Sequence, residues 1–174
     1  MARIAYFNPA MATGRARAAY AKLPDLNIFR MLGHVGDLLD GYYRFGNQLL
    51  AYTSLDPVLR ELAILRVGHR SGSAYELQQH ERIARGIGMA DALLDAAAAG
   101  AGHPALDDRQ RLTIAFVDEV IDNVRASDAT FLPLREWLTD RALQELVLTV
   151  GYYMTVCRFV ETFDVDLEPV GEGA

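Results

Sequence analysis

Residues 56–88 read DPVLRELAILRVGHRSGSAYELQQHERIARGIG and carry the start and end signals of two successive helices. Asp56 followed by Pro57 is typical of a helix start, with an N-cap and a proline in the first turn. Apolar residues then recur at helical spacing to about Arg70, where a Ser-Gly pair interrupts the pattern. Ser73 is a good N-cap for a second helix, which the glycines from Gly86 onward would end. We therefore predict two helices joined by a very short break.

The rest of the chain gives the same kind of pattern. We expect an irregular arm over residues 1–24, a helical domain over 25–165 and a polar tail over 166–174. No strand-like alternation is found, so the predicted fold class is all-α. The predicted last helix, which begins near Asp140, has an inward-facing stripe made of Leu146, Val150, Tyr153, Cys157 and Val160.

Composition narrows the class of protein. The 174 residues carry a net charge of −6, and no cluster of basic residues suggests nucleic-acid binding. The most apolar run, residues 146–157, is too short to span a bilayer, and the N-terminus has no continuous apolar signal segment. We therefore expect a cytoplasmic protein with neither a nucleic-acid nor a membrane partner.

Three polar side chains share one face of the second predicted helix, because residues three, four and seven apart stack on one side. They are Ser73, Glu76 and His80. A carboxylate one turn before a histidine can orient the ring and raise its pKa, which suits a general acid or base. Ser73-x-x-Glu76 is also a capping-box pattern, so an inert, well-capped helix with a buried histidine explains the same residues.

Glu61 lies in an apolar run of the first helix. If it is buried, its pKa should rise and it needs a partner; otherwise it forms a surface pair with Arg60. No metal-ligand spacing is present, and the single cysteine, Cys157, cannot form an intramolecular disulfide. We therefore expect no metal and no cofactor.

Taken together, these motifs resemble a known signature. Residues 60–66 (RELAILR), Tyr75-Glu76, His80-Glu-Arg-x-Ala84 and Gly88 look like the core of the carboxymuconolactone decarboxylase and alkylhydroperoxidase D superfamily. The resemblance covers about residues 26–164. It implies an all-α helical bundle, a small-molecule substrate and a bacterial homo-oligomer, a trimer or hexamer.

The peroxidase branch of that superfamily carries a Cys-x-x-Cys pair, and its positions fall on Ser73 and Glu76. The proton-relay residues of that branch match Glu61 and His80. Peroxide reduction by a dithiol needs both sulfurs, so this chemistry is excluded here. The branch with glutamate at the second cysteine position is closer and includes lactone decarboxylases.

The resemblance and the local pattern together predict a cofactor-free proton-transfer enzyme, similar to a decarboxylase or lyase, that acts on a small carboxylated substrate or lactone. His80 would be the general acid, and Glu76 or Glu61 would orient it or shuttle the proton. The expected substrate-binding residues are Arg66, Arg70, Ser73 and Tyr75. The alternative is a non-catalytic helical oligomer that binds a small ligand or a protein partner.

Overall fold

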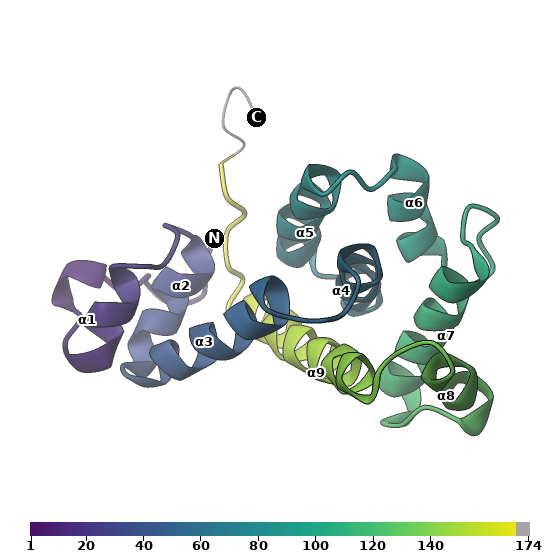
Figure 1. The fold of residues 1–174 in the computed structure, drawn as a ribbon. Helices are drawn as coiled ribbons and strands as arrows, with labels where there is room; N and C mark the ends of the chain where they lie inside the picture. The colour runs from purple at the N-terminus through teal and green to yellow at the C-terminus, as the bar shows by residue number, and fades with distance from the viewer. Residues whose placement is uncertain (170–174) are drawn as a thin grey trace. The chain divides into compact units, whose positions relative to one another are not determined.

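A computed structural model describes residues 1–169, and every regular element in this part of the chain is a helix (Figure 1). The predicted all-α class is therefore confirmed. No helix within the described residues is long and apolar enough to cross a membrane. The elements are η1 (Pro9–Met11), α1 (Gly14–Tyr20), α2 (Asn27–Leu32), η2 (Gly33–Val35), α3 (Leu38–Ala51), α4 (Pro57–Ser71), α5 (Ala74–Gly86), α6 (Asp91–Ala99), α7 (Asp108–Asn123), α8 (Asp128–Arg135) and α9 (Asp140–Thr162).

The chain divides into two compact units. The first comprises Met1–Tyr52 with the described residues from Phe159 onward, and the second is Thr53–Arg158. The predicted boundaries after residues 24 and 165 stay predictions, and the end of the expected tail, residues 170–174, lies outside the described residues.

The first unit contains more regular structure than we predicted for residues 1–24. Asn8 Oδ1 accepts a hydrogen bond from Ala10 N (3.0 Å) and starts η1 at Pro9. The first turn of α1 donates to a residue far along the chain, because Arg15 N lies 2.8 Å from Asp37 Oδ1. This capping contact has no local signal, which explains why the segment was predicted to be irregular.

Helix α4 is the centre of the second unit, where it packs against α5, α6 and α7. Every residue from Leu59 to Gly68 is buried. A helix buried on all sides is normally apolar throughout, yet this one contains Arg60, Glu61 and Arg66. Because a buried charge is costly without a partner, these three residues determine the contacts that α4 must make.

The junction between α4 and α5 is nearly as short as a junction can be. Gly72 adopts a left-handed conformation (φ 64°), which glycine does without steric cost. Ser73 N then donates to Gly68 O (3.0 Å), and Ser73 Oγ accepts from Glu76 N at 3.4 Å. The chain therefore reverses at once, and the first turns of α5 face α4.

Arg66 of α4 forms hydrogen bonds to both α6 and α7. Its Nε and Nη2 donate to the two carboxylate oxygens of Asp118 in α7 (2.7 and 3.0 Å). Its Nη1 donates to the carbonyls of Ala97 and Ala98 in α6 (3.2 and 2.8 Å). Arg70 also donates to Asp118 (2.9 Å), so one carboxylate serves two guanidinium groups.

Replacing Asp118 with asparagine should lower the free energy of unfolding by about 2–3 kcal/mol, because it leaves the Arg66 charge buried with carbonyl partners alone. Urea denaturation measures this loss. The matched control is Asp122→Asn, which removes an exposed partner of Arg70 and should cost less than about 1 kcal/mol. Equal losses in the two variants would contradict the role assigned to Asp118.

Candidate functional site

Both carboxylate oxygens of Glu61 have hydrogen-bond partners within the second unit. Its side chain is fully buried (0% exposed) on α4. Arg60 Nε donates to Glu61 Oε1 (3.1 Å), and His80 Nδ1 lies 2.7 Å from Glu61 Oε2. A carboxylate can only accept in such contacts, so Nδ1 is the ring nitrogen that donates to Glu61.

The other ring nitrogen of His80 faces a second carboxylate. His80 Nε2 lies 3.1 Å from Glu76 Oε1, one turn earlier on α5. The two atoms are close enough for an ion pair but are not aligned for a hydrogen bond, and Glu76 Oε1 has no hydrogen-bond partner among the described residues. A buried carboxylate oxygen in this state can take a proton or accept a bond from a ligand.

The surroundings shift the pKa values of both groups upward. Burial is the main cause for Glu76, with a further rise from the charge of Glu61 that His80 opposes, and its pKa reaches about 7. Burial by itself lowers the pKa of His80, but Glu76 and Glu61 outweigh it, so the net shift is upward. Near neutral pH the cluster therefore gains or loses a proton easily, which is what a proton-transfer site requires.

Tyr153 of α9 completes the packing around the histidine. Its ring meets the His80 ring edge to face, with centroids 4.8 Å apart and planes at 82°. Burial and the two nearby glutamates raise the pKa of Tyr153 well above its ordinary value, so the phenol stays protonated. Tyr153 was predicted to lie on the inward stripe of this helix, with no role in the site. The available signal was a ring with a hydroxyl group among apolar residues.

Arg60 is the second residue that sequence reasoning missed. The Arg60–Glu61 pair was considered as an exposed surface pair, but the side chains are only 10% and 0% exposed. The structure therefore supports the buried interpretation of Glu61. An arginine beside the glutamate was the available signal, because a buried glutamate needs a cation nearby.

The remaining predicted site residues lie in other settings. Arg66 and Arg70 bond to Asp118, and Arg70 also bonds to Asp122 (2.6 Å), so the structure does not bring them to the His80 cluster. Ser73 is buried and caps α5. Tyr75, two residues further along the chain, is also buried. The structure thus brings together Glu61, Glu76 and His80 from the predicted set.

The capping-box interpretation is half right. Ser73 Oγ accepts from Glu76 N, but Ser73 N donates to the Gly68 carbonyl instead of to the Glu76 side chain. The Glu76 carboxylate is therefore available to face His80. No cluster of three or more metal-ligating side chains with suitable geometry is found within residues 1–169.

The cluster is almost completely shielded from solvent. The side chains of His80 and Glu76 are 7% and 3% exposed. Neither of the two pockets described for this structure, one in each unit, is lined by a member of the cluster. A substrate must displace neighbouring side chains to reach His80 Nε2.

The shifted pKa values predict a pH-dependent stability. Glu76 (from 4.5 to about 7) and His80 (raised from 6.5) both bind protons more tightly in the folded state. Folded protein therefore holds more protons than unfolded protein, and stability falls as pH rises from about 4.5 through neutrality. On the acid side, burial by itself raises the pKa of Glu145, but hydrogen bonds from Ser54, Arg141 and Thr53 outweigh it and hold the pKa at about 2. Stability therefore also falls as pH drops below about 4.5.

Melting temperatures measured between about pH 3 and 8 should therefore peak near about pH 4.5. Glu76→Gln removes one of the two groups that titrate above the peak, so its decline toward pH 8 should be shallower than that of the unmodified protein. A melting temperature that rises from pH 5 to 8 would contradict the upward pKa shifts of Glu76 and His80.

Comparisons with known proteins bear on the family and the fold of the chain. Residues 36–119, which contain α4 and α5, match the model of the carboxymuconolactone decarboxylase family. A comparison with curated proteins gives no match.

Solved structures share the fold at low sequence identity. An uncharacterised peroxidase-related protein of Ralstonia eutropha, described as an alkylhydroperoxidase AhpD core, has a TM-score of 0.80 at 18% identity, covering 96% of this chain and 92% of that chain. A protein of unknown function from Agrobacterium tumefaciens, described as a putative antioxidant defence protein AhpD, has a TM-score of 0.73 at 19% identity, covering 80% and 97%. An uncharacterised peroxidase-related protein of Silicibacter has a TM-score of 0.69 at 19% identity, covering 78% and 72%. At these identities the similarity supports the fold alone, and the predicted alkylhydroperoxidase D-like bundle is confirmed.

Proposed function

We propose that this chain, which matches the carboxymuconolactone decarboxylase family over residues 36–119 and lacks a Cys-x-x-Cys pair, is a cofactor-free proton-transfer enzyme, similar to a decarboxylase or lyase. Its substrate would be a small carboxylated compound or lactone. One observation carries the proposal: His80 lies between two buried carboxylates, one hydrogen-bonded to it and one with an unused oxygen.

The proposed step begins with loss of carbon dioxide from the substrate carboxylate, which leaves the bonding electron pair on carbon as an enolate. His80 is protonated at both nitrogens in this step. Its Nδ1–H stays hydrogen-bonded to Glu61, and its Nε2 proton is delivered to that carbon. Glu76, whose pKa is about 7, then returns a proton to Nε2 and takes up one from water, which completes the cycle. In this scheme Glu61 orients the ring, and Glu76 is the proton reservoir.

Arg60 is the cation best placed to hold the substrate carboxylate. Its Nε is used by Glu61, while its terminal nitrogens have no carboxylate partner among the described residues. Arginine binds carboxylates through two parallel N–H bonds, and a buried guanidinium does so more strongly than an exposed one. We therefore assign to Arg60 the role that sequence reasoning gave to Arg66 or Arg70.

The test is a panel of small carboxylated lactones and activated acids incubated with the protein in D₂O. Release of carbon dioxide with one deuterium at the carbon that lost the carboxyl group is the expected result. The Glu76→Gln variant should lose the activity while remaining folded. Failure of every panel member, or activity that Glu76→Gln retains in full, would count against the proposal.

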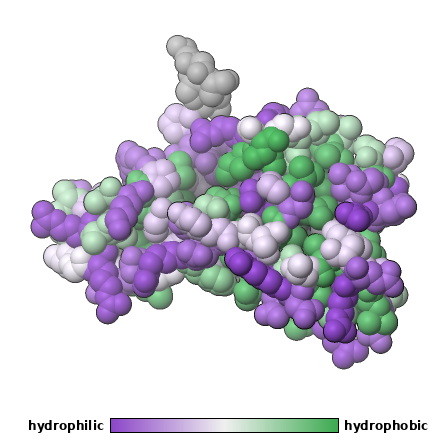
Figure 2. All heavy atoms as spheres, in the orientation of Figure 1, coloured by the Kyte–Doolittle hydropathy of each residue, from purple (hydrophilic) through white to green (hydrophobic). Residues whose placement is uncertain are grey.

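The near-complete burial of the cluster favours a second candidate, the non-catalytic helical oligomer. In that case Glu61 and His80 would be a structural pair, and Glu76→Gln would change stability with no chemistry to lose. Figure 2 shows hydrophobic residues at the surface among hydrophilic ones, and within the second unit Leu132, Val147 and Leu148 are exposed. Exposed apolar side chains of this kind favour a homo-oligomer, which both candidate functions include. Measuring the molecular mass of the protein in solution tests this directly.

A further inference from the structure

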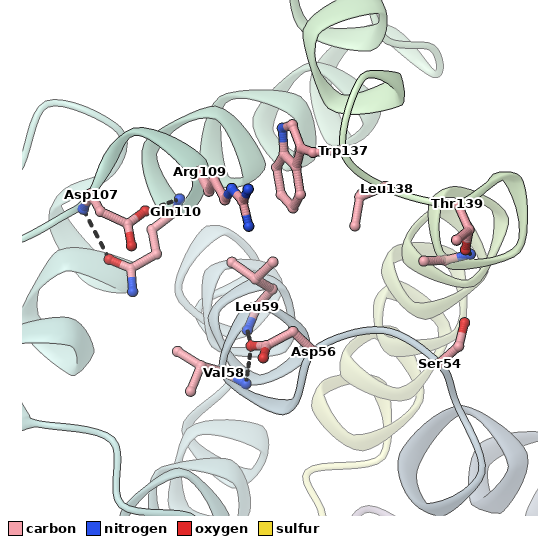
Figure 3. Close-up of a pocket in the computed structure, with 11 residues that line it drawn as sticks. Ser54, Asp56, Val58, Leu59, Asp107, Arg109, Gln110, Trp137, Leu138 and Thr139 are labelled. Carbon is pink, nitrogen blue, oxygen red and sulfur yellow. Dashed lines mark hydrogen bonds between the residues drawn. The ribbon is translucent and has the colours of Figure 1, made fainter.

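A pocket lies in the second unit, apart from the His80 cluster. It has a volume of about 520 Å³ and is lined by residues from the start of α4, the start of α7 and the segment that leads into α9 (Figure 3). Volumes of this size are typical of sites for small molecules. None of Glu61, Glu76, His80 and Tyr153 lines it, so this pocket is separate from the His80 cluster.

The wall of this pocket holds a stacked guanidinium. Arg109 of α7 lies over the indole ring of Trp137, with its Cζ atom 4.9 Å from the ring centroid. Figure 3 shows its nitrogens turned toward the space between Trp137 and Leu59. Within residues 1–169 no carboxylate forms an ion pair with Arg109, whereas Arg66 and Arg70 are both paired.

Stacking fixes the plane of a guanidinium while leaving the N–H groups at its edge free to donate. The orientation of Arg109 is therefore established before any ligand binds. The neighbouring apolar side chains, Leu59 and Leu138, extend the surface of Trp137. A flat apolar group could pack there while a carboxylate meets the guanidinium edge.

Two aspartates limit the charge of the ligand. Asp56 Oδ1 accepts from Val58 N and Leu59 N (2.9 and 3.1 Å) at the start of α4. Asp107 Oδ1 accepts from Gln110 N (2.8 Å) at the start of α7. Both caps are therefore in use, but their negative charges remain at the pocket, where they oppose a second anionic group on a ligand.

We propose that this pocket binds a small monocarboxylate with a flat aromatic body. The ring packs on Trp137, Leu59 and Leu138, and the carboxylate is bound by Arg109. The pocket discriminates against neutral isosteres, which lose the charge-assisted bond, and against dicarboxylates, which Asp56 and Asp107 repel.

The chain provides its own probe, because Trp137 is its single tryptophan. Benzoate, added to the full-length protein, should change the tryptophan emission in a saturable way. Benzamide, the neutral isostere, should bind about tenfold more weakly or worse, and phthalate should also bind more weakly than benzoate.

Arg109→Gln should weaken benzoate binding by about tenfold or more and should remove the preference for benzoate over benzamide. Arg125→Gln is the matched control, since it removes another exposed arginine that does not line the pocket. Titration calorimetry gives the same affinities without relying on emission, and circular dichroism verifies that both variants are folded.

Three results would overturn the proposal. Calorimetry and emission could both show no saturable binding of benzoate. Benzamide could bind as tightly as benzoate. Arg109→Gln could bind benzoate as well as Arg125→Gln does.

Discussion

Replacing His80 with glutamine lowers the turnover of the proposed decarboxylation by about 10²–10⁴-fold, the usual contribution of a positioned general acid. Glutamine can still bond to Glu61 but has no proton to transfer to carbon. The rate is measured by single-turnover kinetics on the first lactone that the unmodified protein accepts. The melting temperature is measured in parallel, because a loss of activity has meaning only if the variant is folded.

The matched control for this variant is Arg82→Gln, which changes an exposed residue on the same helix as His80. It should retain full turnover. If His80→Gln also retains full turnover, His80 is not the acid, and the buried cluster is a structural pair.

Replacing Glu61 with alanine should give the largest loss of stability, about 3–5 kcal/mol. The change leaves the guanidinium of Arg60 without its carboxylate in a buried setting and removes the bond to His80 Nδ1. Truncation also leaves a cavity beside α5, which adds to the loss. Urea denaturation gives the free energy of unfolding, and an unchanged slope shows that the denatured state is comparable.

Glu81→Ala is the comparison for this experiment. Glu81 forms an ion pair with Arg85 on the surface of α5, and surface pairs of this kind contribute less than about 1 kcal/mol. Similar losses for Glu61→Ala and Glu81→Ala would mean that the Glu61 contacts are weak despite their burial.

Local signals made the helical hairpin predictable from sequence. Asp56 with Pro57, Ser73 as a cap and a glycine at the break each act within a few residues, and all three were interpreted correctly. The contact between Glu61 and His80 joins residues in different helices, so spacing alone left it open and the family resemblance supplied it.

Contacts that depend on a distant element were harder to predict from the sequence. Arg66 and Arg70 were assigned to substrate because their partner, Asp118, comes from a helix much later in the chain. Arg60 was considered exposed because nothing local shows that α4 is buried on all sides. The Arg109–Trp137 pocket likewise depends on how α7 and the segment before α9 pack, so no pattern along the chain predicts it.

The bond from Ser73 N to the Gly68 carbonyl determines how freely the side chain at position 76 can be redesigned. Because backbone atoms satisfy that N–H, the start of α5 needs nothing from the side chain at position 76. The reactive group at this position is therefore exchangeable without rebuilding the start of the helix. Such independence between scaffold and reagent makes position 76 a natural starting point for designing a different chemistry on the same two helices.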